Sequence, residues 1–382
     1  MLTADPGEAG RRAAAVARAP LGDSPPSFGV LVASGHFHDA AEALLAAVTE
    51  QTGPLPLIGC VAEAVVGGAR EVEAEPAVSL WLAAGVGPVE TFAMDFVRTP
   101  TGGAFGGYRF EPDRAGVCLM ICDPYTFPVD YQLAHLNSPG AGPLVMGGMA
   151  SGGAEARRGR LFFDGRVLSE GSVGAYLPEA RIHSLVSQGC RPVGEPFTVT
   201  AAEGNFVEEL GGRPAMTRLQ ELATALSARD RELLIQGIQV GIVMNEYGAE
   251  RRQGDFLIRS VLGAQAETGA IAVGGEVDVG QTLQFHVRDA DSADKDLRRI
   301  LEQEAAVLGR RPAGALLFSC NGRGSRLFHE PDHDARLLAR ILGDIPVAGF
   351  FCAGELGPVG GQNYLHAFTA SIALFPGTAP GE

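Results

Sequence analysis

The sequence predicts a mixed α/β fold with two related domains, built from repeated strand–crossover–strand–strand units whose sheets are covered by helices. Its 382 residues exceed what one hydrophobic core normally serves, so two domains are expected. Hydrophobic residues make up 46% and charged residues 20%, which allows a sizeable core. A Pro-to-Gly step, meaning an apolar run that ends in glycine, recurs four times, once without the proline.

The first unit begins with an apolar strand and continues through a helical crossover, with Asp39 as a plausible N-cap and Gly53 beyond its end. Its elements are expected at 28–34 (strand), 39–51 (helix), 56–60 (step) and 77–83 (strand). The second unit repeats this order without a clear helical pattern in its crossover. Its strands are expected at 117–122 and 160–163, with the step at 143–148 between them.

The third and fourth units occupy the C-terminal half. The third has strands at 238–244 and 283–287 around the step at 271–275. The fourth has a strand at 315–320, a helix at 332–342, a step at 345–349 and a strand at 367–375. Two more helices are expected at 217–228 and 293–308, from the spacing of their leucines.

Domain boundaries follow from the order of the units. Two pairs of units predict domains over 27–215 and 216–375. The first 26 residues are rich in Ala, Arg, Pro and Gly, and we expect them to form a flexible tail. Residues 376–382 are expected to form a second tail.

Charge and cysteine content restrict the partners and the compartment. The net charge of −15 comes with no basic face, so nucleic acid and anionic membranes are poor partners. No stretch approaches the roughly 18 apolar residues of a membrane span, and the N-terminus does not resemble a signal peptide. The cysteines form no Cys-x-x-Cys pair and favour free thiols in a reducing compartment. We therefore expect a cytoplasmic protein.

One string resembles a zinc motif. His329-Glu330-Pro331-Asp332-His333 matches H-E-x-x-H, whose chemistry needs both imidazoles on one face of a continuous helix. Pro331 is tolerated only at a helix start, so His329 should lie outside the helix. The sequence therefore predicts no metal site.

Several segments resemble a known family. They are Gly189–Thr200 with Ala202–Asn205, then Leu317–Gly324, Val347–Pro358 and Leu365–Ala370. Together they resemble the FIST N-terminal and FIST C-terminal domains, here over 27–215 and 216–375. The resemblance implies a sensory, signal-transducing module that binds a small ligand, with amino acids often proposed. The chain leaves no room for an output domain, so we expect a protein signalling partner in trans.

The candidate ligand site lies where two apolar strands end in glycine-rich turns, which allow close backbone approach. Arg323 has the fork geometry for a carboxylate, and Glu355 could receive an ammonium group. The alternative is that Arg323 and Glu355 form a scaffold ion pair with each other. The residues assigned to the site are Cys320, Asn321, Gly322, Arg323, Gly324, Cys352, Gly354 and Glu355.

A second set of residues is expected to have a structural role. Arg191, Glu203 and Asn205 belong to the segment between the two pairs of units, and we expect them to lock it. For the whole chain, the leading hypothesis is a sensor without catalysis or cofactor.

Two alternatives to a cofactor-free sensor stay open. Some members of the family resemble haem-binding nitric-oxide sensors, and haem would need an axial His, Cys or Tyr facing an apolar pocket. A thiol-dependent enzyme would use Cys320, with Arg323 near enough to favour the thiolate. We expect Cys320 to be buried or at a pocket edge, and outside any disulfide or metal site.

Overall fold

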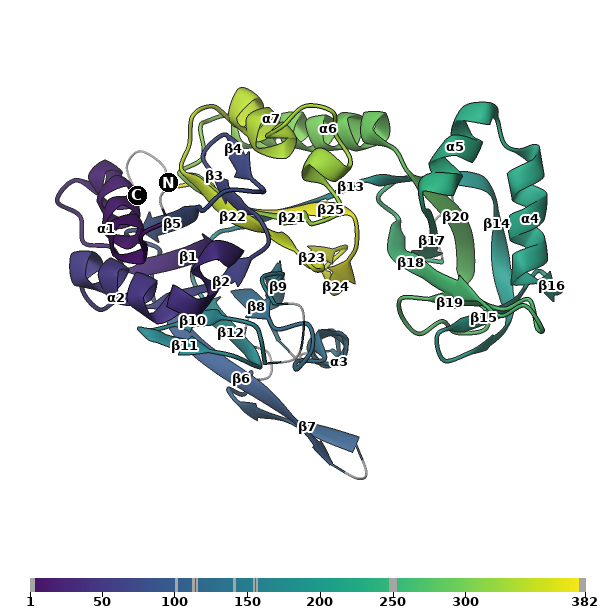
Figure 1. Ribbon diagram of the computed structural model, residues 1–382, viewed down its shortest axis with the longest axis horizontal. Coiled ribbons are helices and arrows are strands. Elements are labelled where there is room, and N and C mark those ends of the chain that lie inside the picture. The colour runs from purple at the N-terminus through teal and green to yellow at the C-terminus, as the bar shows by residue number, and fades with distance from the viewer. Residues whose placement is uncertain are drawn as a thin grey trace. The chain divides into compact units, whose positions relative to one another are not determined.

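The computed structural model describes residues 4–99, 102–111, 114, 116–139, 142–153, 155, 157–246 and 253–377 (Figure 1). Helices combine with mixed sheets and a barrel, so the predicted mixed α/β class with two domains is confirmed. One compact unit comprises residues 1–186, 300–365 and 370–382, and the other comprises 187–299 and 366–369. The compact units are thus interleaved along the chain, whereas the predicted domains were contiguous and met at residue 215.

The first unit contains a repeated arrangement of strands. In the first repeat, two parallel strands are joined by a helix, and a third strand runs antiparallel on the other side of the first. These elements are β1 (Phe28–Ser34), the 3-10 turn Gly35–Ala40 with α2 (Ala41–Thr52), β2 (Leu57–Ala62) and β5 (Val78–Ala83).

Two other segments of this unit have the same strand order. The second repeat consists of β8 (Val117–Cys122), α3 (Val129–Leu136), β9 (Leu144–Met149) and β12 (Ser172–Leu177). The third consists of β21 (Gly314–Cys320), α7 (His333–Leu342), β22 (Val347–Cys352) and β25 (Thr369–Phe375). Helix α3 is a crossover that the sequence pattern did not predict.

Each repeat also contributes a short hairpin to the sheet of another repeat. The hairpin of the first repeat pairs with β22, that of the second pairs with β2, and that of the third pairs with β9. The hairpins are β3 (Val65–Gly67) with β4 (Arg70–Val72), β10 (Leu161–Phe163) with β11 (Arg166–Leu168), and β23 (Glu355–Val359) with β24 (Gln362–His366). The three repeats therefore form a closed ring of exchanged hairpins.

The glycine of each Pro-to-Gly step has the same steric role in all three repeats. A Cβ on Gly59, Gly147 or Gly349 would lie 1.8, 1.9 or 1.8 Å from a carbonyl oxygen of the neighbouring parallel strand. The backbone there approaches too closely for any side chain. The repeat seen in the sequence thus marks a close contact between strands.

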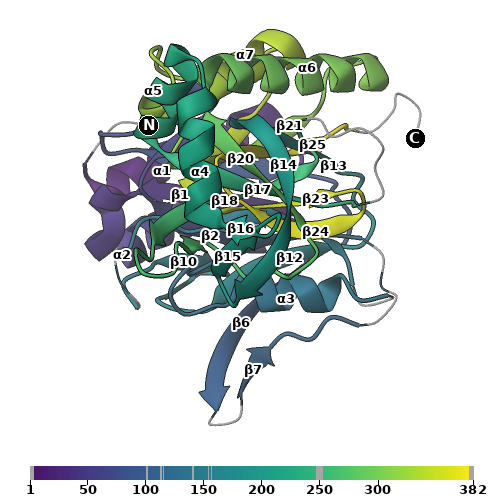
Figure 2. The ribbon, with the colours of Figure 1, turned by 90° about the vertical axis from the view of Figure 1, so that its right-hand side faces the viewer.

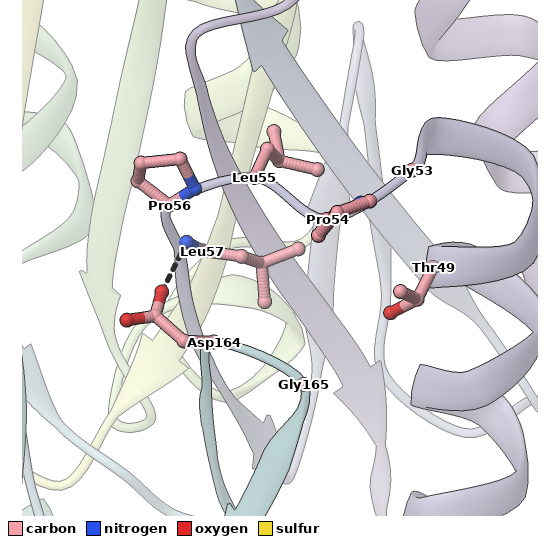
Figure 3. A pocket seen from close by; sticks show the side chains of 8 residues that line it. All are labelled: Thr49, Gly53, Pro54, Leu55, Pro56, Leu57, Asp164 and Gly165. Carbon is pink, nitrogen blue, oxygen red and sulfur yellow. Dashed lines mark hydrogen bonds between the residues drawn. The ribbon is translucent and has the colours of Figure 1, made fainter.

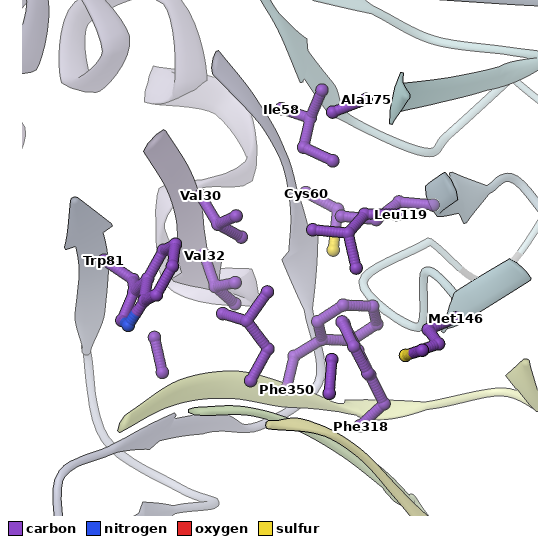
Figure 4. Packing of buried hydrophobic residues seen from close by; sticks show 14 of the residues in the cluster. Val30, Val32, Ile58, Cys60, Trp81, Leu119, Met146, Ala175, Phe318 and Phe350 are labelled. Atoms are coloured by element: carbon purple, nitrogen blue, oxygen red, sulfur yellow. The ribbon is translucent and has the colours of Figure 1, made fainter. Parts of the chain in front are cut away.

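One hydrophobic core joins the three repeats. Figure 4 shows Val32 of β1, Leu119 of β8 and Phe318 of β21 among side chains packed into a common cluster. The cluster also includes Trp81 and Phe350, and all five residues are almost fully buried. One face of each sheet therefore contributes to this shared core, while separate clusters form between β1, β2 and α2 and between β8, β12 and α3.

The remaining strands of the first unit extend its sheets. Beyond β12, β6 (Glu90–Thr99) and β7 (Gly102–Gly107) form a two-stranded ribbon that ends one sheet. Strand β13 (His183–Gln188) lies beside β25, and its last two residues belong to the second unit. The chain returns from the second unit within α6 (Ala290–Leu308).

The predicted flexible tail over residues 1–26 is corrected by the structure. Helix α1 (Pro6–Arg18) begins after Asp5, whose side chain accepts a hydrogen bond from the Glu8 N–H, and proline occupies its first position. Ala9, Ala13 and Ala14 are buried. Small residues allow close packing, since a Cβ on Gly10 would lie 2.9 Å from the Leu44 carbonyl oxygen of α2. Residues 378–382 of the predicted C-terminal tail lie outside the described residues.

The second unit is a closed antiparallel barrel with two helices. Strand pairing runs through six strands and returns from β15 to β14. They are β14 (Cys190–Glu203), β20 (Thr282–Arg288), β17 (Ile238–Val243), β18 (Phe256–Ala264), β19 (Ile271–Val273) and β15 (Phe206–Leu210). Figure 2 shows α4 (Ala215–Ala225) and α5 (Ala228–Gln236), which follow the short strand β16 (Arg213–Pro214).

The third predicted unit does not share the repeat. Strand β17 pairs with β18 and β20, and both pairings are antiparallel, so it has no parallel neighbour or helical crossover. Within the described residues, the repeat therefore occurs three times, all in the first unit. No described helix is long and apolar enough to cross a bilayer.

Replacing Gly349 by alanine should destabilise the protein, because the new Cβ would overlap the Leu317 carbonyl oxygen. Overpacking costs about 1–3 kcal/mol, and two backbones cannot relax by changing a rotamer, so we expect a loss of at least about 2 kcal/mol in urea unfolding. Gly35→Ala is the control, since open space surrounds Gly35. Equal stability of the two variants would contradict the steric explanation.

Candidate functional site

The carboxyl ends of the parallel strands in the first unit bring polar residues from all three repeats together. Glu63 follows β2, Ser151 follows β9, and Asn321 follows β21. The Glu63 N–H donates to the Ser151 hydroxyl at 2.9 Å, and the Asn321 amide lies 3.4 Å from the Glu63 carboxylate. Such strand ends are the usual ligand position in α/β sheets.

Arg326 adds a cation to this group. It ends the 3-10 turn Gly324–Arg326, pairs with the Glu63 carboxylate, and donates to the Asn321 carbonyl oxygen at 2.8 Å. The Arg326 and Glu63 side chains are 55% and 39% exposed, so a solute can reach both charges. We call Glu63, Ser151, Asn321 and Arg326 the strand-end cluster.

Cys320 lies beneath the strand-end cluster. It ends β21, is 6% exposed, has a free thiol and accepts the Gly322 N–H at 3.4 Å through its sulfur. Its burial agrees with the prediction. Asn321 and Gly322 are half-buried, and of the predicted ligand residues they are the two that reach the surface.

Arg323 forms an ion pair with Asp334, and not the alternative scaffold pair with Glu355. Arg323 is fully buried and contacts Asp334 through two bonds, at 2.7 and 2.8 Å, while its guanidinium lies 5.2 Å from the Phe328 ring. The first turn of α7 carries Asp334 to the loop. Although burial opposes it, Arg323 holds the pKa of Asp334 well below its usual range.

The remaining predicted ligand residues are buried. Glu355 begins β23 opposite Gly148 of β9 and has no exposed surface. Cys352 is also fully buried, and burial raises the pKa of its thiol. The buried glycines are Gly324 and Gly354, the latter accepting the Met149 N–H at 2.8 Å. These buried residues support the strands and turns that carry the strand-end cluster.

Comparison with known families identifies the chain. Residues 27–213 match the FIST N domain and residues 215–358 match the FIST C domain. The chain belongs to the FIST family. FIST domains are known as sensory domains of signal transduction.

Close relatives of this FIST chain occur in mycobacteria. An uncharacterized protein of Mycobacterium tuberculosis is 51% identical over 367 residues, which cover 96% of each chain. An uncharacterized protein of Mycobacterium bovis is 49% identical over 373 residues, 98% of this chain and 96% of the relative.

Two carboxylates, Glu71 and Glu73, connect the β3–β4 hairpin to α7 and to the loop that carries Arg326. Glu71 of β4 accepts the Ala335 N–H of α7 at 2.9 Å, and its own N–H donates to Asp332 at 2.8 Å. The next carboxylate, Glu73, accepts both the N–H and the hydroxyl of Ser325, at 2.9 and 2.6 Å. The hairpin of the first repeat is therefore bonded to the loop and helix of the third.

The predicted interdomain residues of the FIST chain all lie within the second unit. Arg191 of β14 pairs with Asp289 at 2.5 Å and also with Asp230. Asn205 donates to the Val273 carbonyl oxygen at 3.0 Å and fixes the turn between β14 and β15. Glu203 ends β14 and is exposed.

A haem would need an axial ligand, and His286 is one buried histidine to consider. His286 is fully buried, donates from Nδ1 to the Gln284 carbonyl oxygen at 3.0 Å, and has no Nε2 partner in the described part of the chain. Burial lowers its pKa to about 4. However, a Cβ on Gly241 would lie 2.3 Å from the ring, and Phe256 packs at 4.8 Å between centroids. The residues around His286 are too tightly packed to fit a porphyrin.

In the described ranges, no group of three or more His, Cys, Asp and Glu residues could hold a metal ion. His329 precedes α7, which begins at His333. The H-E-x-x-H string therefore does not place its two imidazoles on one helix.

A cavity of about 370 Å³ lies at the opposite end of β2 from Glu63 (Figure 3). Asp164 in its wall accepts the Leu57 N–H at 2.9 Å and the Thr91 hydroxyl at 2.6 Å. The Asp164 carboxylate thus holds the turn of the β10–β11 hairpin against Leu57 and Thr91. The lining residues are Thr49, Gly53, Pro54, Leu55, Pro56, Leu57, Asp164 and Gly165.

Replacing Arg323 by alanine should destabilise the fold by about 3–5 kcal/mol, because Asp334 would keep a buried, uncompensated charge. Asp334→Ala should have a similar effect, and the double variant should cost less than the sum of the two. Urea unfolding of all three variants measures the coupling. Arg336→Ala is the control, because the Arg336 side chain is 52% exposed and its single contact with Asp332 should contribute at most about 1 kcal/mol. Additive effects of the Arg323 and Asp334 substitutions would contradict a coupled pair.

Glu71 should make stability depend on pH. Burial and the neighbouring Asp334 raise its pKa from 4.5 to about 8 in the folded state, so the folded protein keeps a proton that the unfolded chain releases. This contribution is fully present below pH 4.5 and is lost as pH rises towards 8. Glu71→Gln should therefore flatten the fall in stability over this range.

Urea unfolding near both ends of this pH range provides the measurement. Glu42→Gln, an exposed substitution on α2, is the control and should keep the wild-type slope. A Glu71→Gln curve parallel to the wild-type curve would show that Glu71 titrates normally.

Proposed function

We propose that this FIST protein is a cytoplasmic sensory module that binds a small zwitterionic ligand, an amino acid or a similar metabolite, at the strand-end cluster. It performs no catalysis, carries no cofactor, and passes its signal to a protein partner in trans. The observation that carries this proposal is the accessible pair of opposite charges, Arg326 and Glu63, where three repeats meet. Six buried free thiols support a reducing compartment.

The exposed pair is suited to exchange with a ligand. A half-exposed ion pair contributes only about 0–1 kcal/mol, so separating Arg326 from Glu63 costs little. A zwitterion supplies both opposite charges: its carboxylate would bind the guanidinium, and its ammonium would bind Glu63. Asn321 and Ser151 add an amide and a hydroxyl beside this pair.

The buried residues of the predicted site have a supporting role in this proposal. Arg323 fixes the loop that carries Asn321 and Arg326, because its bidentate bond to Asp334 leaves little freedom. Ser325, next to Arg326, donates its hydroxyl hydrogen bond to Glu73, the residue that follows β4 of the hairpin. Movement of Arg326 towards a ligand would therefore shift the loop and, through these contacts, the hairpin and α7. Such a shift could be recognised by a protein partner.

Arg326→Gln and Glu63→Gln should each weaken binding about 10- to 150-fold, corresponding to the 1.5–3 kcal/mol of a hydrogen bond to a charged group. Calorimetry with a panel of free amino acids, after native mass spectrometry for any retained ligand, measures this effect. The melting temperature should change little, because the pair is exposed.

Arg98→Gln is the matched control, an exposed arginine on β6 away from the strand-end cluster. Ligand analogues without the amine or the carboxylate should lose affinity as well. Unchanged affinity in folded Arg326→Gln and Glu63→Gln proteins would exclude the strand-end cluster.

A further inference from the structure

A second cavity, of about 360 Å³, lies between the β3–β4 hairpin and the start of β5. Its volume falls at the lower end of the roughly 300–1,000 Å³ of small-molecule sites. Arg12 of α1 completes its wall. The lining residues are Arg12, Val65, Gly67, Arg70, Val72, Ala77, Val78 and Ser79, and none belongs to the strand-end cluster.

The hairpin presents different residues to its two sides. Val65 pairs with Val72, and Gly67 pairs with Arg70, so these four share the face that lines the cavity. Glu71 belongs to the opposite face, where it bonds the first turn of α7. The residues that line the cavity are thus separate from those that hold the hairpin to the helix.

The polar groups of the cavity are available for a ligand. Ser79 is 8% exposed, and its hydroxyl has no hydrogen-bond partner in the described part of the chain. Arg70 is exposed and forms no ion pair with any described residue. Arg12 pairs with Glu8 at 2.9 Å, but both side chains are about half-exposed, so this pair is easily exchanged.

The composition of the wall specifies a chemical class. Two guanidinium groups, Arg12 and Arg70, line this one cavity in a chain whose net charge is −15. Guanidinium groups bind carboxylates with a matched fork geometry. Val65, Val72, Ala77 and Val78 provide apolar walls that would contact an aliphatic chain.

We propose that this cavity binds a small monocarboxylate with a short aliphatic chain. The carboxylate contacts Arg70, Arg12 and the Ser79 hydroxyl, and the chain lies against the valines. This site is distinct from the strand-end cluster, and the proposal does not depend on the sensory function.

Calorimetry with hexanoate tests the proposal on the full-length protein. Hexanoate should bind, whereas inorganic phosphate, which lacks the chain, and 1-hexanol, which lacks the charge, should bind at least about tenfold more weakly. Arg70→Gln and Ser79→Ala should each weaken hexanoate binding about tenfold or more. Arg98→Gln should not change it, because Arg98 lies on β6 outside the cavity.

A second variant separates loss of the site from loss of the fold. Val72→Phe adds volume to the cavity wall and should reduce hexanoate binding, with circular dichroism confirming that the protein is folded. No hexanoate binding by the wild-type protein would overturn the proposal. Binding lost in Arg326→Gln but retained in Arg70→Gln would also overturn it, since the carboxylate would then occupy the strand-end cluster.

Discussion

The exchange of hairpins among the three repeats is the constraint on which the first unit depends. Each parallel strand pair has one edge that is completed only by residues of another repeat. The same exchange places the inward faces of all three sheets against one core, in which Val32, Leu119 and Phe318 meet. The glycine of each step allows the strands to approach within backbone contact. No repeat can therefore be removed without exposing an edge and part of the core of its neighbours.

The candidate site follows from this ring. Because the three parallel pairs share a centre, their carboxyl ends bring Glu63, Ser151 and Asn321 together from segments far apart in sequence. Two arginines three residues apart then have different roles. Arg323 is desolvated and held by a bidentate carboxylate, while Arg326 remains in water beside Glu63. Burial distinguishes the residue that fixes the loop from the one that can change partners.

Much of the first unit could be predicted from sequence, because its central strands are continuous apolar runs. The close approach at Gly59 and Gly349 was visible as a repeated step, although its cause was not. The hairpin exchange could not be predicted, since β3 pairs with β22 far along the chain and local pattern carries no information on such pairing. Helix α1 was missed because its buried face is alanine, which signals burial only when α2 is present.

The predicted ligand residues share the loop after β21 with the proposed strand-end cluster, but most of them are buried. The charges of Arg323 and Glu355 favour a ligand site, but the sequence alone does not show that both side chains are fully buried. Asp334 as a partner of Arg323 depends on the position of α7. Glu63 could be found by aligning the repeats, because it follows β2 just as the segment with Ser151 follows β9. No sequence pattern indicates a binding role for Arg326, apart from its position next to the glycine-rich turn.

The ring also has a consequence for synthesis on the ribosome. The β3–β4 hairpin ends at Val72, and its partner strand begins at Val347. At about 5–20 residues per second, roughly 15–55 s pass between the emergence of the two. During that time β3 pairs with β4 on one edge, while its other edge at Val65 and Val66 lacks β22. Strand β2 lacks β10 for a shorter period. The nascent chain is therefore expected to need protection by chaperones until β22 has been made.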